Sequence, residues 1–101
     1  MKMKLEKQTL KAYEAKVTIL KAMAHPTRLF ILDKLKENTL CVCEINEFIN
    51  ADVSTISKHL SLLKSAGLVS STKKGLQVFY KLETPCILNS LSCVEGINNS
   101  H

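Results

Sequence analysis

The stretch Ser54–Val69, with the sequence STISKHLSLLKSAGLV, decides the fold predicted for this chain. It opens with short hydroxyl and cationic side chains and continues with isoleucine and leucine at helical spacing, so one face of a helix is apolar. Gly67 follows the last turn, where glycine commonly ends a helix. Small polar groups at the start of a helix can reach base edges and phosphates in a DNA groove. The stretch therefore predicts the recognition helix of a helix-turn-helix unit.

The spacing of apolar residues predicts further elements on both sides of this helix. Upstream, helices are predicted over residues 5–24, 26–37 and 42–49, followed by a turn at Asn50-Ala51-Asp52. Downstream, we predict strands over residues 68–72 and 76–82 around a turn at Lys73-Lys74-Gly75, and then a last helix that begins at Thr84-Pro85. This order predicts a mainly α fold with a two-stranded β wing, which is a winged helix-turn-helix with extra N- and C-terminal helices.

The recognition helix is also predicted to have a defined start and a defined buried face. Asp52 or Ser54 has the short polar side chain that caps helix N-termini. The residues expected to face the core share helical spacing and are Val53, Ile56, Leu60 and Leu63.

The chain is short enough to form one domain over residues 1–101. We expect about eight residues at the N-terminus and about six at the C-terminus to be mobile, because nothing in their sequence ties them down. The outer helices carry apolar stripes, such as Leu10, Tyr13, Val17 and Leu20, that one small core cannot absorb. These stripes predict a two-fold homodimer interface formed by the extra helices.

Composition restricts the class of protein. The formal net charge of +5 favours a polyanion as partner. No run of about eighteen apolar residues could span a membrane, and the N-terminus is too polar for a secretory signal, so we expect a cytoplasmic protein without a membrane partner. In that compartment its four cysteines should be reduced thiols and not structural disulfides. We expect them to be metal ligands, redox groups or small core residues. We find no Ser/His/Asp set, phosphate loop or paired carboxylates, so we expect neither an enzyme nor a small-molecule substrate.

Four pieces of the chain together resemble one family of proteins. They are Ala24–Leu29 (AHPTRL), Leu40–Ile45 (LCVCEI), the stretch Ser54–Val69 and the basic hairpin Lys73–Leu82 (KKGLQVFYKL). In order and spacing they are similar to the ArsR/SmtB metal-responsive repressors, over roughly residues 10–82, and resemble the arsenic-sensing branch. The resemblance implies a homodimeric repressor that leaves its double-stranded operator DNA when an inducer binds.

The chain departs from that family's pattern at two positions. The arsenic-sensing branch often has a third cysteine three residues after the Cys-Val-Cys pair, where this chain has Asn46. The helix before the pair usually opens with Asp-Pro, and here it opens with His25-Pro26, which we expect to be a weaker cap. The first departure bears on which inducer the chain binds, and the second only replaces one helix cap with a weaker one.

The residues expected to contact DNA lie on the recognition helix and on the wing. Hydroxyl, imidazole and ammonium groups of the helix should enter the major groove, where they can reach bases and phosphates. These residues are Ser54, Thr55, Ser57, Lys58 and His59, and the wing residues expected on phosphate or in the minor groove are Lys73, Lys74 and Gln77. Arg28 is expected to be structural or a phosphate clamp. We expect a palindromic operator and binding that weakens steeply with salt.

Cys41 and Cys43 are the predicted inducer site, because thiolates bind As(III) and other soft ions. In a regular helix their side chains would point about 200° apart. Both can face one ion only if Cys41 is non-helical at the helix start, a position that should also lower the thiol pKa. As(III) prefers three sulfurs, so the third would come from Cys86 or Cys93 of either subunit.

Several alternatives stay open on the sequence alone. The same fold could sense Cd(II), Pb(II) or Zn(II), or it could use its thiols as a redox or persulfide sensor. Cys41 and Cys43 could also be small core residues, and the chain could be an interaction module that does not bind DNA. A zinc site across the last helix looks absent, because residues 84–95 supply only Glu95 as a carboxylate or imidazole ligand.

Overall fold

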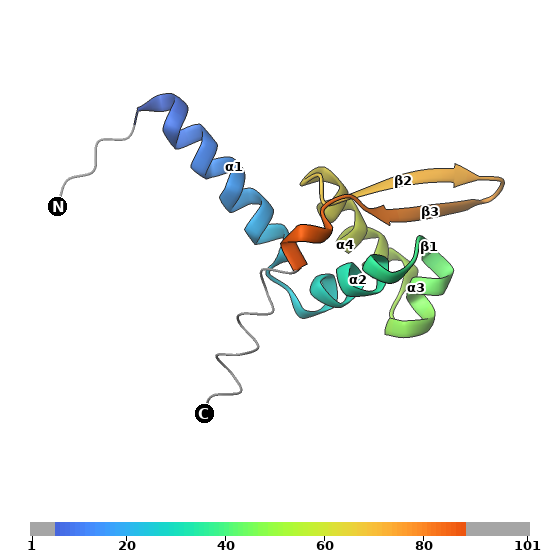
Figure 1. The fold of residues 1–101 in the computed structure, drawn as a ribbon. Helices are drawn as coiled ribbons and strands as arrows, with labels where there is room; N and C mark the ends of the chain where they lie inside the picture. Colours follow the sequence, from blue (N-terminus) through green and yellow to red (C-terminus); the bar gives the residue numbers. More distant parts are fainter. Residues whose placement is uncertain (1–5, 89–101) are drawn as a thin grey trace.

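The computed structural model describes residues 6–88, which form helices and a small sheet (Figure 1). The elements in chain order are α1 (Lys7–Met23), α2 (Pro26–Glu37), β1 (Leu40–Cys41), α3 (Val42–Ile49), α4 (Val53–Ser65), β2 (Val69–Lys74) and β3 (Gln77–Leu82). A further helical turn covers residues 85–88. The predicted winged helix-turn-helix is confirmed, with α3 and α4 as its two helices and β2–β3 as its wing.

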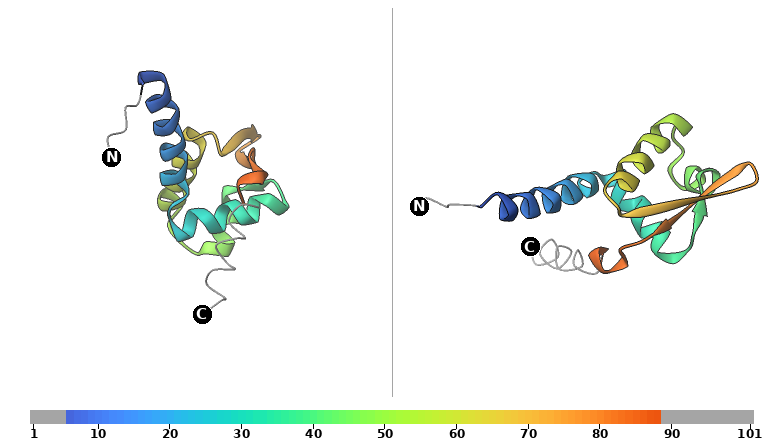
Figure 2. Two further views of the ribbon diagram at one scale, coloured as in Figure 1. Left: turned by 60° about the vertical axis from the view of Figure 1, so that its left-hand side comes forward. Right: turned by 90° about the horizontal axis from the view of Figure 1, so that it is seen from above.

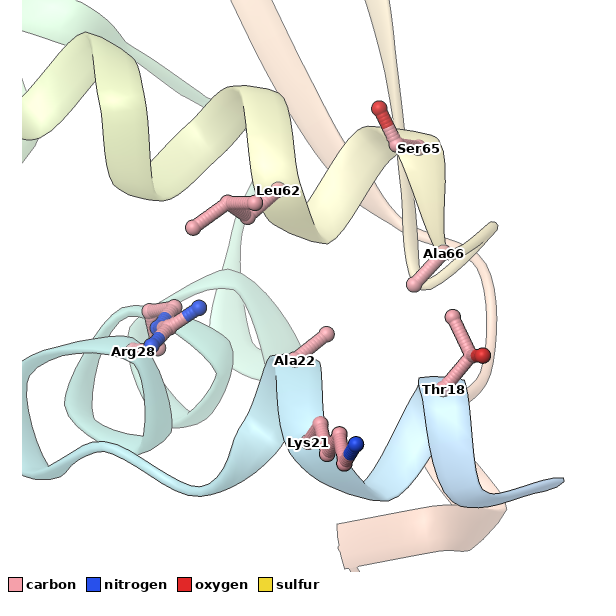
Figure 3. Close-up of a pocket in the computed structure, with 7 residues that line it drawn as sticks. All are labelled: Thr18, Lys21, Ala22, Arg28, Leu62, Ser65 and Ala66. Carbon is pink, nitrogen blue, oxygen red and sulfur yellow. The ribbon is translucent and has the colours of Figure 1, made fainter. Parts of the chain in front are cut away.

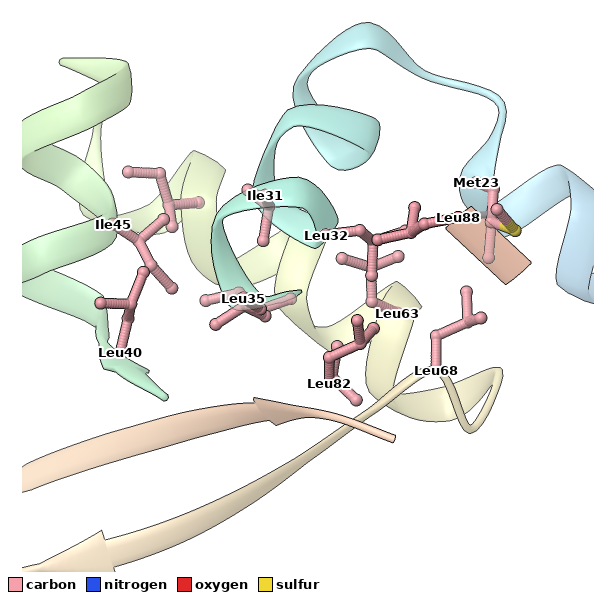
Figure 4. Close-up of a cluster of buried hydrophobic side chains, with 14 residues drawn as sticks. Met23, Ile31, Leu32, Leu35, Leu40, Ile45, Leu63, Leu68, Leu82 and Leu88 are labelled. Atoms are coloured by element: carbon pink, nitrogen blue, oxygen red, sulfur yellow. The ribbon is translucent and has the colours of Figure 1, made fainter. Parts of the chain in front are cut away.

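The core holds α4 firmly against α2 and the base of the wing (Figure 4). Ile56, Leu60 and Leu63 of α4 have no exposed surface. They pack in one cluster with buried side chains of α2 and with Leu68 and Leu82 of the wing. Val53 was predicted on this face, and that prediction is wrong, because 59% of its surface is exposed. The first turn of α4 therefore extends beyond the core.

α4 ends at a glycine, as predicted. Gly67 has φ +81°, a backbone conformation that costs other residues energy. Its N–H donates to the Lys64 carbonyl and the Leu68 N–H donates to the Leu63 carbonyl, both at 3.0 Å. This pair of bonds is the Schellman arrangement, which satisfies helix carbonyls and turns the chain into β2.

The wing differs from the prediction in two details. The register pairs Lys74 with Gln77, so the hairpin loop is Gly75-Leu76 and not residues 73–75. Gly75 has φ +63°, which fits the positive φ that two-residue hairpin loops require. The sheet also has a third strand, since β1 pairs antiparallel with β3 through Leu40–Tyr80 and Cys41–Phe79. Two residues are too few to show strand alternation in a sequence.

α1 extends away from the other helices in two views (Figures 1 and 2). Only Ala22 and Met23, at its C-terminal end, are buried. Within residues 6–88 the predicted stripe is not covered, and its exposed fractions run from 41% for Leu10 to 61% for Leu20. Of the termini expected to be mobile, residues 7–8 already lie in α1, whereas residues 1–5 and 96–101 are outside the described part of the chain.

The start of α2 explains why His25 can stand before Pro26. Its Nδ1 accepts a hydrogen bond from the Thr27 N–H at 3.0 Å, and Pro26 occupies the first turn. The imidazole therefore supplies the acceptor that a capping carboxylate would supply. Within residues 6–88, none of the helices has the length and apolar character needed to cross a membrane.

Candidate DNA interface and thiol pair

The turn between α3 and α4 sets the direction of the recognition helix. Asn50 takes a left-handed conformation with φ 55°, which asparagine tolerates better than most residues. The Asn46 side-chain oxygen accepts the Ala51 N–H at 3.1 Å and closes the turn. Asp52 is at the N-cap position, as predicted, although its side chain makes no capping hydrogen bond.

The structure places four of the five predicted groove residues on the outer surface of α4. Ser54, Thr55, Ser57 and Lys58 are all exposed. They project from the part of α4 that follows the turn, opposite the buried face of Ile56 and Leu60. A polar, cationic helix surface of this shape can enter a major groove.

His59 is separate from those four residues. Its ring is half-buried and lies against His25, with 4.5 Å between the ring centroids. Burial, together with the nearby His25 and Arg28, lowers the pKa of His59 below its usual 6.5. The imidazole therefore packs between α4 and the start of α2 and is not in the exposed set.

The wing carries its predicted polar residues on an exposed hairpin. Lys73, Lys74 and Gln77 are exposed, and the Lys74 ammonium lies 5.7 Å from the centre of the Phe79 ring. Sequence reasoning missed Leu76, whose side chain is 100% exposed at the tip. The Lys64 ammonium of α4 donates to Ser71 Oγ at 2.8 Å, which ties the base of the wing to the recognition helix.

Cys41 and Cys43 come together at the junction of β1 and α3. Cys41 ends β1 with extended backbone (φ −84°, ψ 166°) and is the N-cap of α3, so its side chain swings toward Cys43. The two sulfur atoms lie 2.7 Å apart. Cys41 is buried and Cys43 is exposed, so the pair can be reached from solvent on one side. This is the predicted non-helical arrangement of Cys41, which allows both sulfurs to face one ligand.

The pKa of Cys41 differs from the prediction. We expected the helix N-terminus to lower it, but the hydrogen bond with Cys43 and the burial of the thiol raise it above its usual 9.0. The Cys41 N–H donates to the Glu44 carboxylate at 3.0 Å, and this bond lowers the pKa of Glu44. The backbone N–H of Glu44 at the start of α3 does lower the pKa of Cys41, but by less than the bond with Cys43 and burial raise it.

The thiol pair also contacts the wing. The Gln77 Nε2 group donates to Cys43 Sγ at 3.9 Å, a weak bond across 34 residues of sequence. Cys41 pairs with Phe79 of β3 through the sheet. Both cysteines therefore join α3, the first helix of the helix-turn-helix, to the strand that carries the wing.

Comparison with known proteins identifies the family. The chain matches the family described as "Bacterial regulatory protein, arsR family" over residues 25–71. A helix-turn-helix transcriptional regulator of Methanocaldococcus jannaschii is 44% identical over 72 residues, which cover 70% of this chain and 81% of that protein. The chain belongs to the ArsR family. It is therefore a DNA-binding transcriptional regulator and not an enzyme, which argues against the alternative of a module without a DNA role.

Two further proteins are similar to this chain, one in sequence and one in structure. The cadmium resistance regulatory protein CadC of Listeria innocua is 40% identical over 79 residues, which cover 77% of this chain and 65% of CadC. The structure of reduced HlyU from Vibrio cholerae superimposes with a TM-score of 0.76 at 34% identity, covering 88% of this chain and 97% of HlyU.

Within residues 6–88 of a single chain, the structure places no third sulfur beside the pair. Asn46, at the position of the expected third cysteine, is occupied in closing the α3–α4 turn. Cys86 is exposed on the helical turn at 85–88, and residues 6–88 contain no group of three His, Cys, Asp or Glu side chains placed to hold a metal. Cys93, Glu95 and His101 lie outside the described residues.

Proposed function

We propose that this ArsR-family chain is a homodimeric transcriptional repressor that a thiophilic inducer releases from its operator by binding Cys41 and Cys43. The observation that carries the proposal is the 2.7 Å approach of the two sulfurs where α3 meets the wing strand. Every element that would contact DNA is attached to this junction or packs beside it.

DNA binding in the proposal uses two copies of the chain. The exposed residues of α4 enter the major groove, and Lys73, Lys74 and Gln77 contact the flanking backbone or minor groove. The uncovered stripe on α1 pairs with the second copy, because an exposed apolar stripe on an extended helix is stabilised by burial in a dimer. A two-fold dimer requires a palindromic operator with half-sites about one helical turn, or a multiple of it, apart.

Ligand binding would move the junction. An ion shared by both sulfurs fixes their separation and the angle between the two sulfur–ion bonds, so side chains that turn freely before binding must shift into one arrangement. Cys41 is held in the sheet by its pairing with Phe79, so the shift falls on Cys43 and the first turn of α3. That shift changes how α4 and the wing fit one DNA site. The coupling is reciprocal and is typically worth about 1–3 kcal/mol.

As(III) is the inducer we propose, with Cys86 or Cys93 of the same chain or of its partner as the third thiol. Cd(II) is the main rival, because CadC is by its name a cadmium resistance regulator. Pb(II) and Zn(II) have the same soft-ligand chemistry. The two principal inducers differ in how many protons they release when they bind thiols.

The proposal is tested by fluorescence anisotropy on a duplex selected from a random library with the wild-type protein. As(III) and Cd(II) are added to the wild type, to the double variant C41S/C43S and to C86S. We expect the inducer to release the wild type and the double variant to stay bound. Release of the double variant by As(III) would show that the inducer acts elsewhere, whereas loss of response in C86S would identify the third thiol.

A second function is favoured by the same short sulfur–sulfur distance. Cys43 is exposed and Cys41 is within reach of it, so the pair could form a disulfide in response to an oxidant. In that reaction the two thiols lose two electrons and two protons while hydrogen peroxide is reduced to water. A polysulfide such as H₂S₃ could instead bridge the pair: one of its sulfur atoms joins Cys41 to Cys43, and its other two sulfur atoms leave as two molecules of hydrogen sulfide that carry away the two thiol protons. Release of DNA by peroxide or polysulfide, with mass spectrometry showing a Cys41–Cys43 link and no affinity for metal, would select this function.

A further inference from the structure

A cleft between α1, α2 and α4 is lined by two cationic side chains, Lys21 and Arg28 (Figure 3). It is lined by Lys21 of α1, Arg28 of α2 and Leu62 of α4, with Thr18 and Ser65 at its rim. Arg28 Nε is buried and has no hydrogen-bond partner. Buried polar groups are almost always paired, so the guanidinium of Arg28, which lines this cleft, is left short of a hydrogen-bond partner.

The surroundings of Arg28 carry positive or neutral groups. Within residues 6–88, no carboxylate pairs with Arg28 or Lys21. Arg28 lies near His59, and its positive charge disfavours the charged form of that imidazole. A half-buried guanidinium without a counter-charge favours an anionic ligand, because its planar donors match two oxygens of a phosphate.

The cleft shares one lining residue with the proposed DNA-reading surface. Leu62 lines it, and Leu62 also lines a shallow depression on the outer face of α4 with Ser57, Lys58 and Ser61. Lys58 is one of the residues proposed to enter the major groove. The sugar-phosphate backbone borders that groove, so a helix seated in it brings neighbouring clefts close to phosphate oxygens.

We propose that Arg28 and Lys21 form a binding site for a phosphate oxyanion. The occupant with DNA bound is a backbone phosphodiester beside the major groove, and this part rests on the proposed function. Free phosphate is the other source of the same chemistry. The site supplies affinity and orientation without reading sequence, because a phosphodiester is the same at every base pair.

The DNA arm of the test measures binding at several salt concentrations for wild type, R28Q and K21Q. A selected duplex and a random duplex are used, and the matched control is K11Q on the exposed surface of α1. If a phosphodiester fills the site, each variant lowers the log-log salt slope by about 0.9 and weakens both duplexes equally. K11Q should leave the slope unchanged. Circular dichroism and R28K show whether the fold is retained.

The second arm uses inorganic phosphate and the protein without DNA. Phosphate should raise the melting temperature of the wild type and not that of R28Q, with chloride at equal ionic strength as the control. A response in both arms supports a site whose phosphate group comes from DNA. A response in the inorganic phosphate arm alone supports a site that binds the free anion. No response in either arm overturns the site. Wild type that binds no duplex would refute the proposed function, while the phosphate arm would still test the cleft.

Discussion

Exchanging Cd(II) for arsenite as the inducer changes the proton balance at Cys41. The pKa of Cys41 is raised above 9.0 by the hydrogen bond with Cys43 and by burial, so this group is a protonated thiol at neutral pH. Cd(II) must displace that proton to form its bond to sulfur. Each displaced proton makes the affinity rise by about tenfold per pH unit, and the rise continues until pH passes the raised pKa.

Arsenite behaves differently because it is the uncharged acid As(OH)₃ at neutral pH. Each new arsenic–sulfur bond replaces one hydroxyl group, and the thiol proton leaves with that hydroxyl as water. No net proton is released, so the affinity for arsenite should stay almost constant at neutral pH. For Cd(II) we expect a rise of at least about tenfold per pH unit from Cys41 alone.

The assay is isothermal titration calorimetry in two buffers with different ionisation enthalpies, which gives the number of protons released. C41S is the critical variant, because it should remove at least one released proton per Cd(II). C86S distinguishes protons lost at the junction from protons lost at a third ligand. A Cd(II) affinity that does not change between about pH 6 and pH 8 would refute the reasoning, because it would mean that Cys41 is already a thiolate.

Further predictions concern stability and coupling. L60A should lower the free energy of unfolding by about 2–5 kcal/mol in urea denaturation, because Leu60 is fully buried, whereas L76A at the exposed wing tip should change it by less than about 0.5 kcal/mol. G67A should cost about 1 kcal/mol, since Gly67 has φ +81° but its added Cβ would meet no atom within 4 Å. Folding lowers the pKa of His59, so the neutral imidazole contributes to the free energy of unfolding above its usual pKa of 6.5. This contribution is lost as pH falls through the lowered pKa. H59Q should therefore flatten the acid limb of the stability–pH curve. Q77A removes the bond to Cys43, so the inducer should still bind but release DNA less completely, and an unchanged release in anisotropy would show that Gln77 carries no coupling.

The sequence was sufficient for the helices because their signals are local. The apolar spacing of α4 and its glycine stop lie within one short stretch, and both appear in the structure. β1 could not be predicted, since it exists only through pairing with β3 almost forty residues later. Val53 has the right spacing for burial, but spacing does not show where the core ends.

The sequence predicted which residues form the candidate site better than it predicted the chemistry of their side chains. The approach of Cys41 to Cys43 followed from the position of the pair at a helix start. The pKa of Cys41 did not follow, because it depends on the hydrogen bond between the thiols and on burial. His59 shares the sequence spacing of the groove residues, and only the packing of α2 against α4 shows that its ring faces His25.

β1 contributes only two residues to the sheet, and this shortness determines what an inducer has to disturb. A two-residue ladder has few backbone hydrogen bonds, so opening it costs far less than opening the core around Leu60. The hairpin could then change its angle to the helices while α2, α3 and α4 stay packed. A chemical signal worth a few kilocalories per mole would thus be enough to alter the spacing of two DNA-binding surfaces across a dimer, without unfolding either subunit.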